Sequence, residues 1–379
     1  MTRVLVVSYH FPPAAGVAAA RVGKLVKYLA RLGWEPRVVA ASPRPDALLD
    51  DDLAADVAGI ERVEVSPTRG APGVQGADWA SAALAPARRL AGSADVAFVS
   101  GGPFMPFLLG PALGIPYVLD FRDPWSYEPR FGRLDRRVRR RAGLALERRA
   151  EAIAVRRARA IVTVAPQLSA EYAHLYPGAR SRIRTLRHGY DPEDFADAPA
   201  PATPPMLVHA GTMAPSDRSP GLLLETARLV RSRGVPLRVR LLGRFPEQFE
   251  PLAREARREG WLDTPGYLPR RTTTRAMQEA TVLWLEPGDL DFLITGKIYE
   301  YLASARPIVA AAPPDGAVAD LLEATGGGVV VPADPAGCAV AVAAAVAGRI
   351  PETRPDVLSR LSHPHLAGEL AGVLGRARR

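Results

Sequence analysis

Apolar runs alternate with amphipathic stretches along the chain. The runs in the first half that we expect to be strands are residues 3–8, 36–41, 96–100, 116–120 and 160–164. Between the first two, residues 18–32 have an apolar side formed by Val22, Leu25, Val26 and Leu29, and Gly33 follows as a helix stop. Strands that are apolar on both faces and separated by helices indicate a parallel sheet. The first half is therefore predicted to be a Rossmann-like, doubly wound α/β domain.

A second alternating series follows a change in composition. Residues 196–205 are rich in Ala and Pro, which disfavours a continuous helix or strand there, so we interpret them as a linker region. The expected strands beyond it are residues 206–210, 237–242, 281–285, 307–311 and 328–331. With 379 residues the chain is also long for one hydrophobic core. We predict two Rossmann-like domains, 1–197 and 206–350, facing a central cleft, followed by helices in 351–379.

The charge of the chain is positive and uneven. The net charge is +9, and only three of the 49 basic residues are lysines, which suggests a coding preference for arginine. Twelve arginines lie between Arg130 and Arg159, in a stretch of helical character. Two interpretations stay open: a solvated arginine-rich helix, or peripheral contact with anionic lipid headgroups. No nucleic-acid partner is expected, because no reading module or interleaved aromatic residues accompany the charge.

The sequence predicts a cytoplasmic protein, peripheral at the inner face of the membrane if the lipid interpretation holds. No apolar run approaches the roughly 20 residues that a membrane crossing needs. The N-terminus lacks the apolar region of a signal peptide. The single Cys338 excludes an intramolecular disulfide and is consistent with a reducing compartment.

The most informative segment is residues 295–310. Thr295, Gly296 and Lys297 form a turn that opens a short helix, and a buried strand follows Pro307. Unpaired backbone N–H groups at such a turn favour a phosphate, and Lys297 adds a positive charge. Glu300, one turn into the helix, is placed to accept hydrogen bonds from a sugar hydroxyl. The segment indicates a sugar-nucleotide site.

This segment and four others resemble family-4 retaining glycosyltransferases of the GT-B fold. The other segments, in the order of that family, are residues 4–16, Asp120-Phe121-Arg122-Asp123-Pro124-Trp125, His188-Gly189-Tyr190-Asp191-Pro192-Glu193-Asp194-Phe195, and Leu207-Val208-His209-Ala210-Gly211-Thr212-Met213. The resemblance covers roughly residues 3 to 345. It implies sugar transfer from a nucleoside diphosphate sugar with retention of configuration, and the leaving phosphate accepts the proton of the acceptor. It also implies no metal and no cofactor, and a last helix that crosses back onto the first domain.

The resemblance assigns donor binding to the second half. The donor candidates are Gly211, Thr212, Arg218, Gly266, Tyr267, Ile294, Thr295, Gly296, Lys297 and Glu300. Among these, Glu300 is expected at the ribose, Gly266 and Tyr267 at the base, and Lys297 and Arg218 at the leaving diphosphate. Two positions depart from the family pattern: Phe292 replaces a common Glu, and Thr212 replaces a common Arg.

Acceptor binding is assigned to the first half. The acceptor candidates are Gly16, Asp120, Arg122, Asp123 and Trp125, and His10 is a further candidate for sugar contact. Asp123 and Trp125 are expected to face the cleft, where a carboxylate can hold hydroxyls and an indole can stack on a sugar. Asp120 either joins them or pairs with Arg122 to shape the loop. The catalytic candidates are Asp123, His10, Lys297 and Arg218, whereas His188 and Asp191 are interpreted as structural.

Two other functions fit the same fold. A sugar-nucleotide-binding protein with impaired catalysis would explain Phe292 and Thr212, and a nucleotide-sugar epimerase shares the architecture. The sequence leaves the acceptor open between a lipid-linked saccharide, a cell-surface polymer and a small metabolite.

Overall fold

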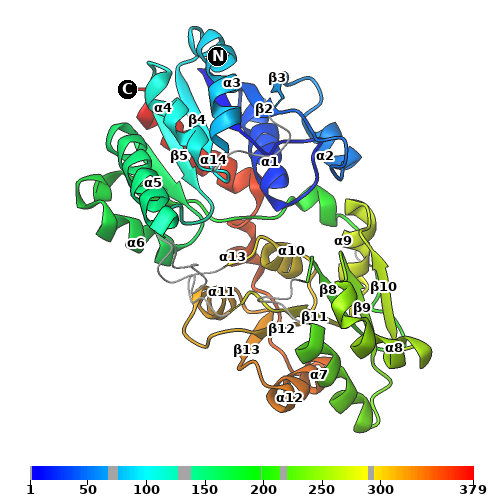
Figure 1. Cartoon of the computed structure of the whole chain (residues 1–379). Coiled ribbons are helices and arrows are strands. Elements are labelled where there is room, and N and C mark those ends of the chain that lie inside the picture. Colours follow the sequence, from blue (N-terminus) through cyan, green and yellow to red (C-terminus); the bar gives the residue numbers. More distant parts are fainter. Residues whose placement is uncertain (1, 67–75, 127–137, 198, 214–219, 289–293) are drawn as a thin grey trace. The chain divides into compact units, whose positions relative to one another are not determined.

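The structure is a computed structural model that divides into two compact units (Figure 1). Unit 1 consists of Met1–Arg187 and His363–Arg379, and unit 2 of His188–Ser362. The residues described are 2–66, 76–126, 138–197, 199–213, 220–288 and 294–379, with only the backbone for 138–144. Each unit is built around its own parallel sheet.

Unit 1 contains a parallel sheet of seven strands in the order β3-β2-β1-β4-β5-β6-β7. The strands are β1 Thr2–Ser8, β2 Trp34–Ala41, β3 Glu61–Val65, β4 Val96–Ser100, β5 Tyr117–Phe121, β6 Ala160–Thr163 and β7 Ile183–Thr185. The order reverses between β1 and β4, which is the switch point where doubly wound sheets bind ligands beyond the carboxyl ends of their strands.

Helices connect these strands, and one further helix comes from the C-terminal segment. The helices of unit 1 are α1 Val17–Arg31, α2 Asp51–Asp56, α3 Ala77–Ala91, η2 Met105–Leu108, α4 Leu109–Ala112, α5 Val138–Arg157, α6 Pro166–Leu175, η3 Pro177–Arg182 and α14 His363–Ala377. Figure 1 shows α14 (red) beside α1 (blue). Leu366, Leu370 and Leu374 of α14 recur at four-residue spacing and join the core with Val22 and Leu25. The segment 363–379 is thus an integral part of unit 1.

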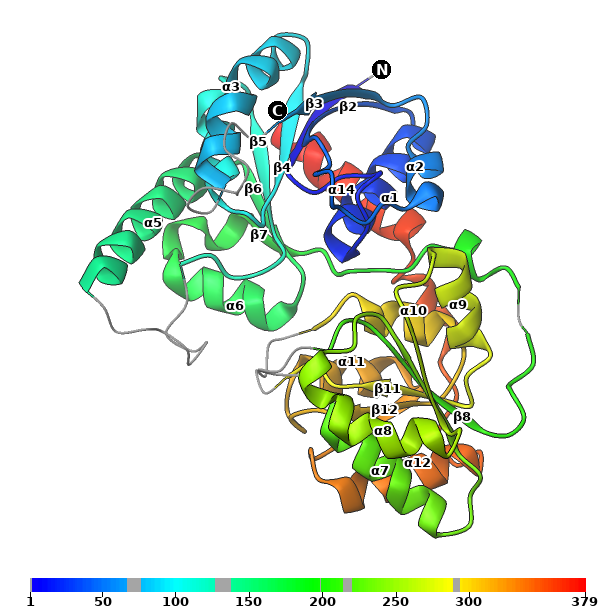
Figure 2. The ribbon, with the colours of Figure 1, turned by 45° about the vertical axis from the view of Figure 1, so that its right-hand side comes forward.

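Unit 2 contains a second parallel sheet, of six strands in the order β10-β9-β8-β11-β12-β13. Its strands are β8 Met206–Ala210, β9 Arg238–Leu242, β10 Leu262–Gly266, β11 Val282–Leu285, β12 Ile308–Ala311 and β13 Gly328–Val331. Its helices are η4 Pro192–Phe195, α7 Pro220–Ser232, η5 Glu247–Phe249, α8 Glu250–Arg258, α9 Arg270–Gln278, α10 Lys297–Ala303, α11 Ala317–Thr325, α12 Pro335–Val346 and α13 Pro355–Ser359. Helices α7 and α12 pack together, and Figure 2 shows them on one side of the sheet.

The predicted fold class is confirmed, and the strands that the sequence pattern missed are β3, β7 and β10. All three lie at an edge of their sheet. An edge strand is half solvated, so it lacks the continuous apolar run of a central strand. In β10 the sequence Leu262-Asp263-Thr264-Pro265-Gly266 even carries two strand breakers. Among the described helices, none combines the length and apolar character that a membrane crossing requires.

The division between the units falls earlier than the expected linker. The chain enters unit 2 at His188, and the Ala- and Pro-rich segment lies inside unit 2. Hydrogen bonds fix that segment: Gln278 donates to Asp197 O, Arg306 to Pro199 O at 2.5 Å, and Ala202 N to Glu279 O at 2.8 Å. Because these partners come from α9 and the turn after α10, the segment is held against unit 2.

Candidate functional site

Helix α10 is fixed to the carboxyl end of β8 by one buried hydrogen bond. The backbone N–H of Ala210, the last residue of β8, donates to the Tyr301 hydroxyl at 2.7 Å. Burial raises the pKa of Tyr301, so its hydroxyl stays protonated. The packing of Ile298 and Leu302 completes the inner face of the helix. The first turn of α10 is therefore held at the edge of the sheet where ligands of doubly wound folds bind.

Glu300 lies in this first turn between two cations. Its Oε2 accepts from Lys297 Nζ at 2.5 Å, and its Oε1 is 3.0 Å from Arg270 Nη2. Its side chain is only 13% exposed. Burial by itself would raise the pKa of Glu300, but Lys297 and Arg270 outweigh it and lower the pKa to about 2. Glu300 is thus ionised at neutral pH, and both of its oxygens have fixed directions.

Arg270 is a residue of this site that sequence reasoning missed. It is the first residue of α9, and its Nε and Nη2 both donate to Oδ2 of Asp194, at 2.9 and 2.8 Å. Asp194 belongs to η4, near the start of unit 2. No local pattern signals the contact, because Asp194, Arg270 and Glu300 are far apart in the sequence. The motif around residues 188–195 is thereby linked to the helix that carries Glu300.

Three neighbouring strands of unit 2, β8, β9 and β10, each have a glycine at their carboxyl end, and these glycines pack closely together. Gly211 N donates to Leu242 O at 2.7 Å, and Gly243 N donates to Gly266 O at 2.8 Å. Gly243 has a φ of 124°, and a Cβ built on it would lie 2.5 Å from Gly211 O. A side chain at Gly243 would therefore collide with backbone. Gly211 and Gly266 were predicted from the sequence as donor residues, whereas Gly243, which follows the strand Arg238–Leu242, was not.

The remaining donor candidates fall into three groups. Thr212 and Tyr267 are exposed at this edge, beside Gly211 and Gly266. Thr295 and Gly296 precede α10, Ile294 is buried, and Thr295 Oγ1 is buried without a hydrogen-bond partner among the described residues. Arg218 and Phe292 lie outside the described residues.

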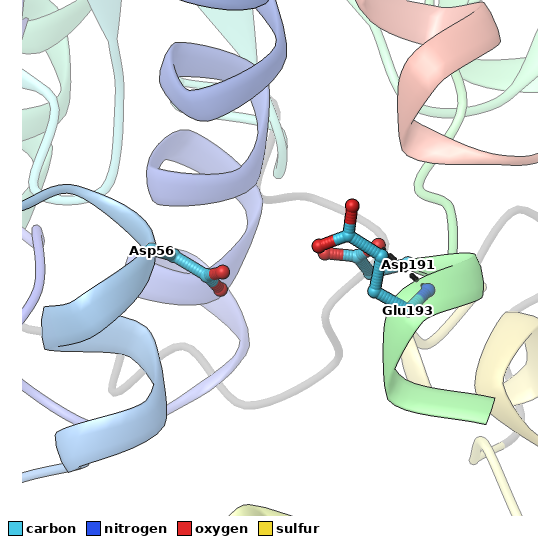
Figure 3. A group of neighbouring side chains, drawn as sticks. All are labelled: Asp56, Asp191 and Glu193. Carbon is cyan, nitrogen blue, oxygen red and sulfur yellow. Dashed lines mark hydrogen bonds between the residues drawn. The ribbon is translucent and has the colours of Figure 1, made fainter. Parts of the chain in front are cut away.

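His188 and Asp191, interpreted from the sequence as structural, have internal contacts in unit 2. The His188 ring lies 6.3 Å from that of Tyr299 on α10. Asp191 caps η4, since its Oδ1 accepts from Glu193 N at 3.1 Å (Figure 3). Asp56, also drawn there, pairs within unit 1 with Lys24 and Lys27 of α1, at 2.6 Å each. The prediction that activity needs no metal ion is not tested by these contacts and stays a prediction.

In unit 1, Asp120 forms a buried ion pair with a residue that the sequence analysis did not consider. Asp120 is fully buried at the end of β5, and its Oδ1 is 2.9 Å from Arg21 Nη2 of α1. Its Oδ2 accepts from Ser100 Oγ at 2.8 Å. Arg21 also donates to the backbone oxygens of Leu186 and Arg187. Asp120 thus joins β4, β5 and α1 in the interior, and its ion-pair partner is Arg21 instead of Arg122.

Arg122 and Trp125 also differ from the expectation of an open acceptor surface. Arg122 is buried and donates to Gly101 O at 2.8 Å and to Gly102 O at 3.1 Å, so it fixes the turn after β4. Trp125 is 2% exposed, and its ring stacks on Phe104 at a centroid distance of 5.8 Å. Its indole is part of an aromatic core and has no open face for a sugar.

The remaining acceptor candidates of unit 1 do not belong to its buried core. They are Asp123, His10 and Gly16. Asp123 is exposed between buried neighbours. Burial and the nearby charge of Arg122 lower the pKa of His10 to about 4, so its imidazole is neutral at pH 7. Gly16 precedes α1 with a φ of 111°, a conformation that glycine adopts readily.

The arginine-rich stretch forms helix α5, and its outer face carries apolar side chains as well as charge. Leu146 is 59% exposed and Ile153 is 42% exposed. Leu146, Arg149, Ile153 and Arg156 recur at intervals of three and four residues, so they share one face. The triple arginine at 139–141 lies where side chains are not described. The described part of α5 therefore exposes apolar and cationic side chains together on one face.

The fold of the chain has counterparts in solved structures. A sucrose-phosphate synthase from Thermosynechococcus elongatus is similar with a TM-score of 0.65 and 15% identity, covering 99% of this chain and 95% of that chain. A glycosyltransferase from Rickettsia africae ESF-5 is similar with a TM-score of 0.67 and 12% identity, over 99% and 98%. The S. aureus MnaA structure with UDP is similar with a TM-score of 0.57 and 11% identity, over 97% and 94%. At these identities the similarity establishes the fold, which is GT-B.

The family follows from the sequence. The model of the family described as Glycosyltransferase Family 4 matches residues 6–194. This chain belongs to Glycosyltransferase Family 4, which confirms the resemblance found in the sequence. No curated protein matches the sequence.

Proposed function

We propose that this glycosyltransferase moves a sugar from a nucleoside diphosphate sugar to an acceptor hydroxyl with retention of configuration. The observation that carries the proposal is the ionised Glu300, fixed between Lys297 and Arg270 beside the glycine-lined ends of the strands. A fixed carboxylate accepts hydrogen bonds from ribose hydroxyls well, because charge strengthens each bond. A UDP complex of a protein with the same fold agrees with a nucleotide ligand.

In this proposal unit 2 binds the donor. Glu300 holds the ribose, and backbone groups at Gly266 and Tyr267 contact the base. Lys297, Thr295 and Gly296 contact the diphosphate, with Gly211 and Thr212 on its other side. Arg218 is assigned to the diphosphate from the sequence alone. Backbone of Ile294 contacts the transferred sugar. The Thr295 hydroxyl, which has no hydrogen-bond partner in the described part of the chain, supports a polar ligand at this place, since a buried hydroxyl without a hydrogen bond is costly.

Unit 1 binds the acceptor, with Asp123 and His10 as the contacting side chains and Gly16 allowing close approach. Asp120, Arg122 and Trp125 support the loop from inside. In the reaction the bond between the anomeric carbon and the phosphate oxygen breaks, and the acceptor oxygen bonds to the same face of that carbon. The acceptor proton passes to the leaving phosphate. Lys297 and Arg218 stabilise the charge that develops there, so no metal ion is required.

We also propose that α5 contacts an anionic membrane and that the acceptor is a lipid-linked saccharide. Exposed Leu146 and Ile153 support insertion between headgroups, and Arg149 and Arg156 on the same face complement anionic lipid. In this proposal the protein works at the inner face of the membrane.

Mass spectrometry of the products provides the test. The purified protein is incubated with a panel of nucleoside diphosphate sugars, with lipid-linked and soluble acceptors, and with EDTA. The expected result is a glycosylated acceptor whose anomeric configuration matches that of the donor. An epimerised donor without transfer would favour the epimerase alternative. Donor binding without any product would favour the catalytically impaired alternative, and a strict need for Mn²⁺ or Mg²⁺ would contradict the metal-free reaction.

Calorimetry tests the donor site separately. Glu300→Gln is expected to weaken nucleoside diphosphate binding by roughly 1.5–3 kcal/mol, the contribution of a hydrogen bond to a charged group. Unchanged affinity in a folded variant would remove Glu300 from the site.

A further inference from the structure

The carboxylate of Glu300 is held from two different elements. Lys297 lies on the same helix, three residues before it, whereas Arg270 comes from the start of α9. A lysine is a point charge on a flexible stem and does not define the plane of a carboxylate. A guanidinium is a planar fork with fixed donor directions. Arg270 is therefore the partner that can set the orientation of Glu300.

Arg270 is itself held in place. Two of its nitrogens donate to the same oxygen of Asp194, and its Nη2 also reaches Glu300. Arg270 and Asp194 are 13% and 17% exposed, so solvent screens the contacts only in part. The result is a carboxylate–guanidinium–carboxylate chain that runs from η4 through α9 to α10. Each carboxylate oxygen of Glu300 has two lone pairs, so a ligand can still donate hydrogen bonds to Glu300 in this arrangement.

We propose that Arg270, anchored by Asp194, is a positioning residue that aims the Glu300 carboxylate at the ribose hydroxyls of the donor. The inference rests on the proposed function of Glu300. It assigns a role to a side chain that does not itself contact the nucleotide. It also gives the segment that begins unit 2 a part in donor recognition.

The test compares a nucleoside diphosphate with the same molecule lacking its ribose hydroxyls. The first ligand is whichever of UDP, GDP and ADP binds most tightly. The second ligand, for comparison, is the 2′,3′-dideoxy form of the same nucleoside diphosphate. The full-length wild type is expected to prefer the ribose form by roughly tenfold or more, since a hydrogen bond to a charged group contributes at least about one factor of ten. Arg270→Gln and Asp194→Asn are expected to lose most of this preference, and Arg270→Lys to retain part of it.

Arg275→Gln is the matched control, because Arg275 is exposed on the same helix and pairs with Glu279 at i,i+4, away from Glu300. It should keep the full ribose preference. Thermal unfolding with and without ligand checks that each variant is folded. A general loss of structure would weaken both ligands together and leave their ratio unchanged.

Two failures are distinguishable. If Glu300→Gln loses the ribose preference while Arg270→Gln and Asp194→Asn keep it, the positioning role is wrong and the donor site stands. If Glu300→Gln keeps the preference as well, the donor site itself is misassigned, and the role of Arg270 falls with it.

Discussion

Tyr301 accepts the backbone hydrogen bond of Ala210, 91 residues earlier in the sequence, and so joins helix α10 to the first strand of unit 2. Strand β8 runs into Gly211, and α10 begins with Lys297 and carries Glu300 in its first turn. One buried hydrogen bond thus fixes the distance between the glycine-lined edge and the carboxylate that we assign to the donor.

Removing the Tyr301 hydroxyl tests whether this hydrogen bond holds α10 against β8. Tyr301→Phe keeps the ring but leaves the buried N–H of Ala210 without an acceptor, which should lower the free energy of unfolding by about 1–3 kcal/mol. Nucleoside diphosphate affinity should fall as well, because α10 is less firmly held. Tyr190→Phe is the control, since no hydrogen bond of the Tyr190 hydroxyl is present in the described part of the chain. Equal effects in urea unfolding would contradict the prediction.

The low pKa of Glu300 predicts a specific acid sensitivity. Its pKa is about 2 in the folded protein and 4.5 as the ordinary value, so its ionised form stabilises the fold above pH 4.5. That stabilisation is lost as the pH falls toward 2. Between about pH 6 and about pH 3, the unfolding free energy of the wild type should fall by on the order of 2 kcal/mol more than that of Glu300→Gln. Parallel pH profiles of the two proteins in urea unfolding would refute this.

The Arg21–Asp120 pair should be essential to unit 1. Asp120→Asn leaves the Arg21 guanidinium buried without its charge partner and should destabilise the protein by about 3–5 kcal/mol. Arg21→Met should lower the free energy of unfolding less in the Asp120→Asn background than in the wild type, because the two changes remove the same interaction. Asp46→Asn breaks the exposed pair with Arg44 and should cost at most about 1 kcal/mol. Strict additivity in the double-mutant cycle would show that the pair is not coupled.

Gly243 should tolerate no side chain. A Cβ there meets Gly211 O at 2.5 Å, so Gly243→Ala must shift the ends of β8 and β9. Gly234→Ala is the matched control: Gly234 also has a positive φ, of 87°, but nothing lies within 4 Å of its added Cβ. We expect the control to cost about 1–2 kcal/mol from backbone strain and Gly243→Ala to cost clearly more. Similar melting temperatures for the two variants would contradict the packing argument.

Helix α5 predicts salt-sensitive lipid binding. The wild type should sediment with vesicles that contain anionic lipid, and binding should weaken steeply with salt. Arg149→Gln with Arg156→Gln should weaken it by about 1 kcal/mol for each arginine. The charge-matched control is Arg254→Gln with Arg258→Gln on exposed positions of α8. If the wild type ignores anionic vesicles at low salt, α5 is a solvated face and a soluble acceptor is favoured.

Local pattern predicted the central strands, and it failed where a partner distant in the sequence decides the outcome. Val4–Val7 and Val96–Val99 are apolar throughout because both faces are covered, and that signal is visible in the sequence. Trp125 carries no such signal: whether an indole after a strand faces a ligand or a core depends on Phe104 and Tyr172. Arg270 and Arg21 were missed for the same reason, since their carboxylate partners are set by tertiary structure.

The route of the chain has a consequence for how the protein is made. Unit 2 is an insertion within unit 1, since His188–Ser362 separates the first part of unit 1 from α14. During translation, all of unit 2 is therefore synthesised before Leu366, Leu370 and Leu374. The second sheet can fold while the nascent chain is still growing. The first sheet waits with an uncovered apolar surface beside α1 until α14 arrives.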